Sequence, residues 1–167
     1  DDIQKLGHFA STGFSKSYDG FSKSVTIISK YVDEIIKPLK NIEGQLHEKT
    51  IVWDCGNGAS GPSIEMITSK IPGKHIVLYS EVNGNFPNHH PDPTDESTLK
   101  IMLNKMQQVN AELGIAFDGD GDRIGVIDKQ GRSVAGDLLT AFLANSITTI
   151  EKENQTIILD IKSSYIA

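Results

Sequence analysis

The stretch FDGDGDRIGVID, residues 117–128, decides how the surrounding chain folds. Apolar residues lead into it, and a second apolar run follows its arginine, which is the pattern of two strands joined by a short loop. Within the loop, Asp118, Asp120 and Asp122 alternate with two glycines. Because glycine adopts backbone angles that other residues avoid, the three carboxylates can converge on one point instead of alternating between the two faces of a strand.

These three carboxylates predict a metal site. Crowded like charges raise one another's pKa and repel, and a hard divalent cation with oxygen ligands relieves both effects. We therefore interpret Asp118, Asp120 and Asp122 as ligands of Mg²⁺. A calcium loop of the EF-hand type is excluded, because its sixth position needs glycine and its twelfth needs glutamate, where Arg123 and Lys129 stand. The simpler interpretation is a solvated acidic turn, since Asp and Gly are common in turns.

Two further functional classes fit the same loop. In a haloacid-dehalogenase-like phosphatase, Asp118 would attack phosphorus and Asp120 would handle the proton. Asp122, however, stands where that class has Thr or Val. A non-enzymatic metal-binding module would keep the three aspartates but would not need a positively charged side chain, such as that of Lys162, facing a substrate cleft. Phosphate release by this chain alone would distinguish the phosphatase from the other classes.

The chain has 167 residues, enough for one domain with flanking pieces, and a formal net charge of −6 from 22 acidic and 16 basic residues. It has no Lys/Arg cluster, so we expect no nucleic-acid partner. No apolar run reaches the roughly 18 residues that cross a bilayer. With no signal-peptide pattern and one cysteine, Cys55, we expect a cytoplasmic protein without a membrane partner. Because residue 1 is not Met, we expect a processed or truncated chain.

Apolar periodicity predicts the elements around the loop. Residues 1–20 show no sustained period and predict a loop, and residues 22–41 predict a helix that Pro38 kinks or ends. The pattern continues as strand 50–55, helix to Lys70, strand 75–79, helix capped by Thr94 or Asp95 and ending near Val109, strand 113–117 and strand 124–127. This β-α-β-α-β-β order predicts an α/β fold with a mixed, mainly parallel sheet flanked by helices, whose last strand is antiparallel to its predecessor. Such sheets place ligands in loops beyond the carboxyl ends of their strands.

Two connections between these elements carry weaker signals. Residues 56–62 join a strand to a helix through three glycines, which is also the outline of a phosphate cradle, but the Lys-Ser/Thr of a P-loop is missing. A structural turn is favoured. His89, His90 and Asp92 resemble zinc ligands, yet adjacent histidines point apart and a zinc site needs four convergent ligands. We expect instead a proline-rich connection whose His and Asp side chains bond to backbone groups.

The C-terminal part of the chain predicts a helix over residues 138–150 and a strand over residues 156–161. One helix and one strand cannot bury both apolar faces alone, so this tail is typical of the start of another domain. We predict three parts: a lead-in or remnant of a preceding domain at 1–29, a central domain with the metal loop at 30–133, and the start of a following domain at 134–167.

In three segments the sequence resembles the α-D-phosphohexomutases, the phosphomannomutase/phosphoglucomutase family. DGDGDR at 118–123 resembles that family's metal loop, FPNHHPDPT at 86–94 a second segment and DIKSS at 160–164 a third, in the same order. The resemblance implies a fold like the family's second domain for the central part. It also implies pieces of the first and third domains on either side.

The family is identified with an isomerase activity in carbohydrate metabolism, and the resemblance implies that phosphate moves between O1 and O6 of a hexose through a phosphoserine and a bisphosphorylated sugar. It implies Mg²⁺ held by Asp118, Asp120, Asp122 and a phosphoserine oxygen. It makes Arg123 and Lys162 candidates for binding the phosphorylated hexose. The plainer roles are a salt bridge with the aspartates for Arg123 and a solvated surface charge for Lys162.

The family's phosphoserine loop has no counterpart in these 167 residues, so no catalytic nucleophile is assigned. The loops that select the sugar and grip its distal phosphate are also missing, and the remaining mutase domains are the expected partners. We therefore expect the chain alone to be inactive and to bind Mg²⁺ weakly. The segment 89–93 resembles phosphomannomutase/phosphoglucomutase members more than phosphoglucosamine mutases, and the particular hexose stays open.

Overall fold

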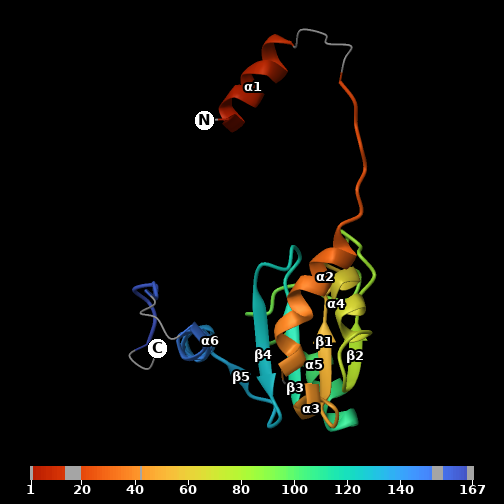
Figure 1. Ribbon diagram of the computed structural model, residues 1–167, viewed down its shortest axis with the longest axis vertical. Helices are drawn as coiled ribbons and strands as arrows, with labels where there is room; N and C mark the ends of the chain where they lie inside the picture. The colour runs from red at the N-terminus through yellow and green to blue at the C-terminus, as the bar shows by residue number, and fades with distance from the viewer. Residues whose placement is uncertain (1, 14–19, 42, 152–155, 165–167) are drawn as a thin grey trace.

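A five-stranded sheet forms the centre of the chain (Figure 1). The computed structural model describes residues 2–13, 20–41, 43–151 and 156–164. The strands are β1 (Thr50–Asp54), β2 (Lys74–Leu78), β3 (Leu113–Phe117), β4 (Ile124–Asp128) and β5 (Ser133–Val134). The helices are α1 (Asp2–Thr12), α2 (Ile28–Ile36), α3 (Glu43–Leu46), α4 (Gly61–Thr68), α5 (Lys100–Val109) and α6 (Gly136–Glu151), with a 3₁₀ helix at Lys37–Asn41.

The strands lie in the order β2-β1-β3-β4-β5. β1 is parallel to both β2 and β3, whereas β4 runs antiparallel to β3, and β5 antiparallel to β4. The predicted fold class is therefore confirmed, as a mixed α/β sheet whose core strands are parallel and are flanked by helices. The sequence does not predict β5, because two residues are too few to show a period.

Helices cover both faces of the sheet. Alternate residues of a strand point to opposite faces, and on one face α5 packs Met102 and Met106 against Val52 of β1. On the other face, Val32 of α2 and Ile64 of α4 pack in a second cluster, and Figure 1 shows these two helices in front of the sheet. Each fully buried aliphatic side chain contributes about 1.5–3 kcal/mol. None of the described helices is long and apolar enough to cross a membrane.

Two predicted helices are correct in type but differ in extent. Residues 22–27 are not helical, and α2 ends at Ile36, just before the 3₁₀ helix that contains Pro38. The expected effect of the proline is therefore confirmed. α5 begins only at Lys100, so the predicted cap at Thr94 or Asp95 is wrong. The carboxylate of Asp95 instead accepts the N–H of Ser97, which closes a separate turn before the helix.

Both ends of the chain differ from the prediction. Residues 2–12 form α1 rather than a loop, although the helix buries no residue; residues 14–19 of the predicted loop lie outside the described residues. Ile3, Leu6 and Phe9 recur about one helical turn apart. This run of three apolar residues is too short to indicate a helix beside a segment rich in serine and glycine. The predicted strand at 156–161 is wrong. In the described chain no strand pairs with these residues, and without a ladder of hydrogen bonds a β-prone run forms no strand.

Candidate metal centre

The carboxyl ends of the three parallel strands meet at one edge of the sheet, and the candidate site lies there. Asp54 is the last residue of β1, and Asp118 follows the last residue of β3. The loop from Asp118 to Arg123 connects β3 to the antiparallel β4. Gly121 in this loop has a φ of +78°, which glycine adopts at little cost. The loop therefore occupies the position where open α/β sheets bind ligands.

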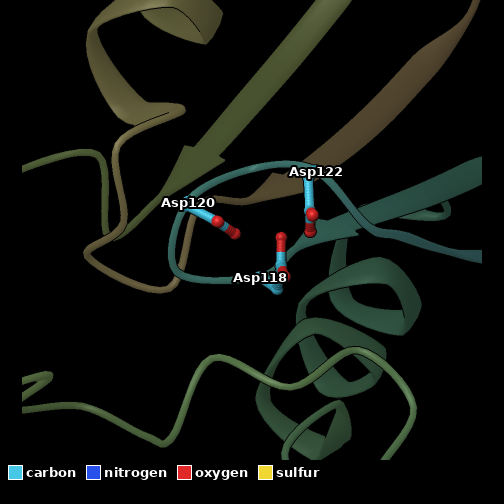
Figure 2. A group of neighbouring side chains, drawn as sticks. All are labelled: Asp118, Asp120 and Asp122. Carbon is cyan, nitrogen blue, oxygen red and sulfur yellow. The ribbon is translucent and has the colours of Figure 1, made fainter. Parts of the chain in front are cut away.

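Three carboxylates converge on the inside of this loop. In Figure 2 the side chains of Asp118, Asp120 and Asp122 point toward one another, and one oxygen of each lies within 4.8 Å of the others. Asp118 is only 2% exposed, whereas Asp120 and Asp122 reach solvent. Elsewhere in the described chain, no group of three His, Cys, Asp or Glu side chains has this spacing. The structure thus brings together the three residues that the sequence singles out.

Arg123 closes the loop onto Asp118. Its backbone N–H donates to Oδ1 of Asp118 over 3.0 Å, and its Nε–H donates to Oδ2 over 2.8 Å. Its Nη1 lies 3.5 Å from Oδ1 of Asp92, and its Nε lies 3.9 Å from an oxygen of Asp122. The guanidinium thus makes the salt bridges of its plainer role. Its side chain remains 55% exposed, so solvent still reaches it.

The charges in the loop shift pKa values in opposite directions. Burial alone raises the pKa of the Asp118 carboxyl, but hydrogen bonds from the backbone and side chain of Arg123, and one with Asp122, lower it to about 2. The hydrogen bond with Asp118, together with the negative charges of Asp120 and Asp118, raises the pKa of Asp122. A carboxylate such as Asp122, whose charged form is disfavoured by negative neighbours, is stabilised when a cation is added.

The glycine turn, residues 56–61, packs directly against the loop. The N–H of Ala59 donates to the carbonyl of Gly119 over 2.9 Å. A Cβ at Gly58 would lie 2.7 Å from the same carbonyl oxygen, and a Cβ at Gly61 would lie 2.0 Å from the carbonyl oxygen of Ser80. Both positions therefore exclude a side chain. These close approaches are those of a structural turn, as the sequence favours, and the one at Gly58 is made directly to the aspartate loop.

The proline segment, residues 86–93, covers the loop from the other side. The ring nitrogen Nδ1 of His89 lies 3.0 Å from the carbonyl oxygen of His90, and Asp92 accepts the N–H of Thr94, so both side chains bond to backbone as expected. Neither histidine belongs to a cluster of metal-ligand type within the described residues.

Sequence reasoning missed the partner of His89. Its Nε2 lies 3.1 Å from both carboxylate oxygens of Asp54, which is fully buried. Burial raises the pKa of the Asp54 carboxyl, although the interactions with His89 and Gly56 oppose that effect. Because 35 residues separate Asp54 from His89, no local pattern predicts the pair. The one available signal was an aspartate at the carboxyl end of a strand, where ligands collect.

Lys162 lies in a different part of the structure. It follows α6 in a turn, where its backbone N–H donates to the carboxylate of Asp160. The N–H of Ser164 donates to Asp137 at the start of α6, which fixes this segment beside that helix (Figure 1). Among the described residues no hydrogen bond or ion pair joins the Lys162 side chain to the aspartate loop.

The fold and the site define a class of protein: an α/β domain with helices on both faces of its sheet and a carboxylate loop beyond a parallel strand. The family model described as phosphoglucomutase/phosphomannomutase, alpha/beta/alpha domain II, matches residues 29–131. This match covers more than half of the chain, so the chain belongs to that family. The resemblance stated from the sequence is therefore confirmed.

Named relatives agree with the family model. A phosphomannomutase/phosphoglucomutase of Pseudomonas syringae pv. tomato is 35% identical over 162 residues, which cover 97% of this chain and 34% of the relative. A phosphomannomutase of Methanocaldococcus jannaschii is 35% identical over 142 residues, covering 85% and 30%. The crystal structure of a phosphoglucomutase/phosphomannomutase family protein from Burkholderia thailandensis matches with a TM-score of 0.72 and 30% identity, over 90% of this chain and 32% of that one. The chain thus spans about a third of the length of the curated relatives it matches.

Proposed function

We propose that this chain is part of a phosphohexomutase that interconverts hexose 1-phosphate and hexose 6-phosphate, and that its loop at 118–123 holds the Mg²⁺ of that reaction. The convergence of three carboxylates at the ligand edge of the sheet carries the metal part of the proposal. Family membership supports the reaction part. In such a reaction a phosphoserine gives its phosphoryl group to the free hydroxyl of the sugar phosphate. The bisphosphorylated sugar then returns its other phosphoryl group to the serine.

The donor set fits Mg²⁺ in its chemistry. Asp118, Asp120 and Asp122 offer oxygen atoms, which hard cations prefer, and neither sulfur nor imidazole belongs to the group. Three protein oxygens leave further positions for water or for a phosphate oxygen, as is usual for Mg²⁺. When bound, Mg²⁺ would neutralise charge on a transferring phosphoryl group.

Arg123 is the residue proposed to bind a phosphate group beside the loop. A guanidinium stays protonated and donates in a planar fork that matches phosphate oxygens. Asp118 and Asp92 hold the group in place while more than half of the side chain remains exposed. For Lys162 the support is the family resemblance alone, because its described contacts lie beside α6.

Other parts of the parent protein are proposed to complete the enzyme. The match at residues 29–131 supports a central domain at 30–133. Parts of the preceding and following domains at 1–29 and 134–167 are proposed from the family resemblance alone. The phosphoserine and the sugar-selecting loops would come from the remaining domains, so the chain alone should not turn over substrate. The relatives carry phosphomannomutase and phosphoglucomutase names, and the proposed substrate class is therefore a phosphorylated hexose.

Calorimetric titration of the chain with Mg²⁺ tests the metal part. We expect weak binding to the wild-type chain and about a hundredfold loss in Asp120→Asn, because affinity follows the number of charged ligands. Asp120 is exposed, so we expect its replacement to leave the fold intact. Equal affinity of the two proteins would remove the loop from the proposal.

Phosphate release tests the alternative class, the haloacid-dehalogenase-like phosphatase. That class predicts Mg²⁺-dependent hydrolysis of a phosphate ester by the chain alone, abolished by Asp118→Asn. The mutase proposal predicts no release by either protein. Hydrolysis by the wild-type chain that depends on Asp118 would replace the mutase proposal with the phosphatase.

A further inference from the structure

The glycine turn and the proline segment enclose the aspartate loop from two sides. On one side, the N–H of Ala59 bonds to the carbonyl of Gly119. On the other side, the rings of Phe86 and Pro91 lie over Gly119, since a Cβ built there would be 3.4 and 3.5 Å from them. The loop is therefore in contact with both neighbours at Gly119.

Two polar contacts join these neighbours to each other. His89 of the proline segment lies 3.1 Å from both oxygens of Asp54, the residue at the end of β1 just before the glycine turn. Next to it, Nδ2 of Asn88 donates to Oδ1 of Asn57 over 2.7 Å. Neither contact touches Asp118, Asp120 or Asp122. Together, the contacts Asp54–His89 and Asn57–Asn88 join the two neighbours of the loop, and we call this pair of contacts the frame.

The contact between Asp54 and His89 is the more strongly enclosed of the two. The Asp54 side chain is fully buried, and the His89 side chain is 12% exposed. Asp54 also accepts the N–H of Gly56 over 2.9 Å, which fixes the first residue of the glycine turn. A buried carboxylate without its partner is costly, so this pair holds the proline segment firmly against β1.

We propose that His89, through Asp54, is a positioning residue for the aspartate loop: it fixes the geometry of the three carboxylates without contacting them or the metal. The proline segment also carries Asp92 to within 3.5 Å of Arg123, so the same anchor positions the guanidinium that is proposed to bind phosphate. The effect on metal affinity rests on the proposed function. The effect on the order of the loop does not.

Amide hydrogen exchange of the metal-free chain is the direct test, with the amides of Ala59 and Arg123 as reporters, because both donate into the loop. In His89→Ala we expect faster exchange at both amides. His75→Ala is the matched control. Its imidazole also makes two hydrogen bonds, with Trp53 and the Pro72 carbonyl, but His75 lies near the amino ends of the parallel strands, away from the loop. It should destabilise the chain without speeding exchange at the reporters.

Mg²⁺ titration of the same proteins gives the second readout. We expect the Mg²⁺ affinity to fall about five- to thirtyfold in His89→Ala and to stay unchanged in His75→Ala. This range corresponds to the entropy cost of fixing the backbone of about one loop residue, which the metal would have to supply in His89→Ala. If His89→Ala does not fold, His89→Asn takes its place, because its side-chain amide can still donate to the His90 carbonyl but is too short to reach Asp54.

The two readouts separate the two proposals. Unchanged exchange in the variant that opens the frame, or the same increase in His75→Ala, would overturn the positioning role. A wild-type chain that binds no Mg²⁺ would instead contradict the proposed function, and the exchange result would still decide the role of His89.

Discussion

The loop before β4 and the turn after it can be compared residue by residue. In the loop, Asp118 accepts the backbone N–H and the Nε–H of Arg123 over 3.0 and 2.8 Å. In the turn, Asp128 accepts the same two groups of Arg132 over 2.9 and 2.7 Å. Each connection also contains a glycine with positive φ, +78° at position 121 and +79° at position 131. Each connection therefore reverses the chain with the same two features, an aspartate–arginine pair and a glycine with positive φ.

The two connections differ in what surrounds the aspartate. The Asp118 side chain is 3% exposed and the Asp128 side chain 27% exposed. Asp120 and Asp122 join Asp118, whereas Lys129 and Gln130 follow Asp128. The aspartate–arginine pair is therefore a means of closing a short connection. The features that make the loop before β4 a candidate metal site are the carboxylates of Asp120 and Asp122 and the burial of Asp118.

The largest expected effect comes from removing each aspartate. Asp118→Ala deletes two hydrogen bonds to a charged group at a buried position, so we expect a loss of about 3 kcal/mol in the free energy of unfolding. Asp128→Ala should cost less, because water replaces the exposed carboxylate. Urea unfolding of both variants measures the difference. Equal losses would show that burial of Asp118 adds nothing.

Acid should weaken the loop in a defined range of pH. The folded-state pKa of Asp118 is about 2, below the unfolded value of 3.8. Its contribution to stability is therefore complete above about pH 4 and is lost as the pH falls toward 2, on the order of 1–2 kcal/mol. Stability measured from pH 6 to pH 2 should fall less steeply in Asp118→Asn. An unchanged slope in that variant would show that other groups cause the acid sensitivity.

The two glycines give a matched pair of backbone variants. Gly121→Ala and Gly131→Ala each place a Cβ in the left-handed region, and we expect each to cost about 1 kcal/mol of stability. Only Gly121→Ala should also weaken Mg²⁺ binding, because only that glycine lies between proposed ligands. Calorimetry on both variants separates strain from metal binding. A loss of Mg²⁺ affinity in Gly131→Ala would break the comparison.

The smallest expected effect has the opposite sign. Arg123→Gln removes a positive charge next to the carboxylates, so we expect Mg²⁺ to bind about two- to fivefold more tightly, which is the scale of an exposed ion pair. Arg132→Gln should leave the affinity unchanged. Weaker binding in Arg123→Gln would show that the arginine organises the ligands more than it competes with the metal.

Local sequence patterns predicted the parts of the structure that local physics determines. The strands around the loop, the end of α5 at Val109 and the antiparallel pairing of β4 with β3 follow from periodicity and short connections. The end of α2 before Pro38 follows from the missing N–H of proline. The convergence of Asp118, Asp120 and Asp122 follows from the glycines between them. Each of these features involves residues close together in the chain.

The missed features depend on partners far away in the sequence. The pair of Asp54 and His89 and the contact of Arg123 with Asp92 join residues 35 and 31 positions apart. The strand expected at 156–161 fails for the same reason, since its ladder needs a neighbour that the described chain does not provide. Local patterns in a single sequence do not show which distant residues pair.

Diffraction from crystals of the chain soaked in Mn²⁺ tests the central claim most directly, because Mn²⁺ prefers the same oxygen ligands as Mg²⁺ and its anomalous signal locates the ion. We predict one strong peak between the carboxylates of Asp118, Asp120 and Asp122, and no peak at Asp128. Anomalous density that is absent from the loop, or that appears equally at Asp128, would contradict the account.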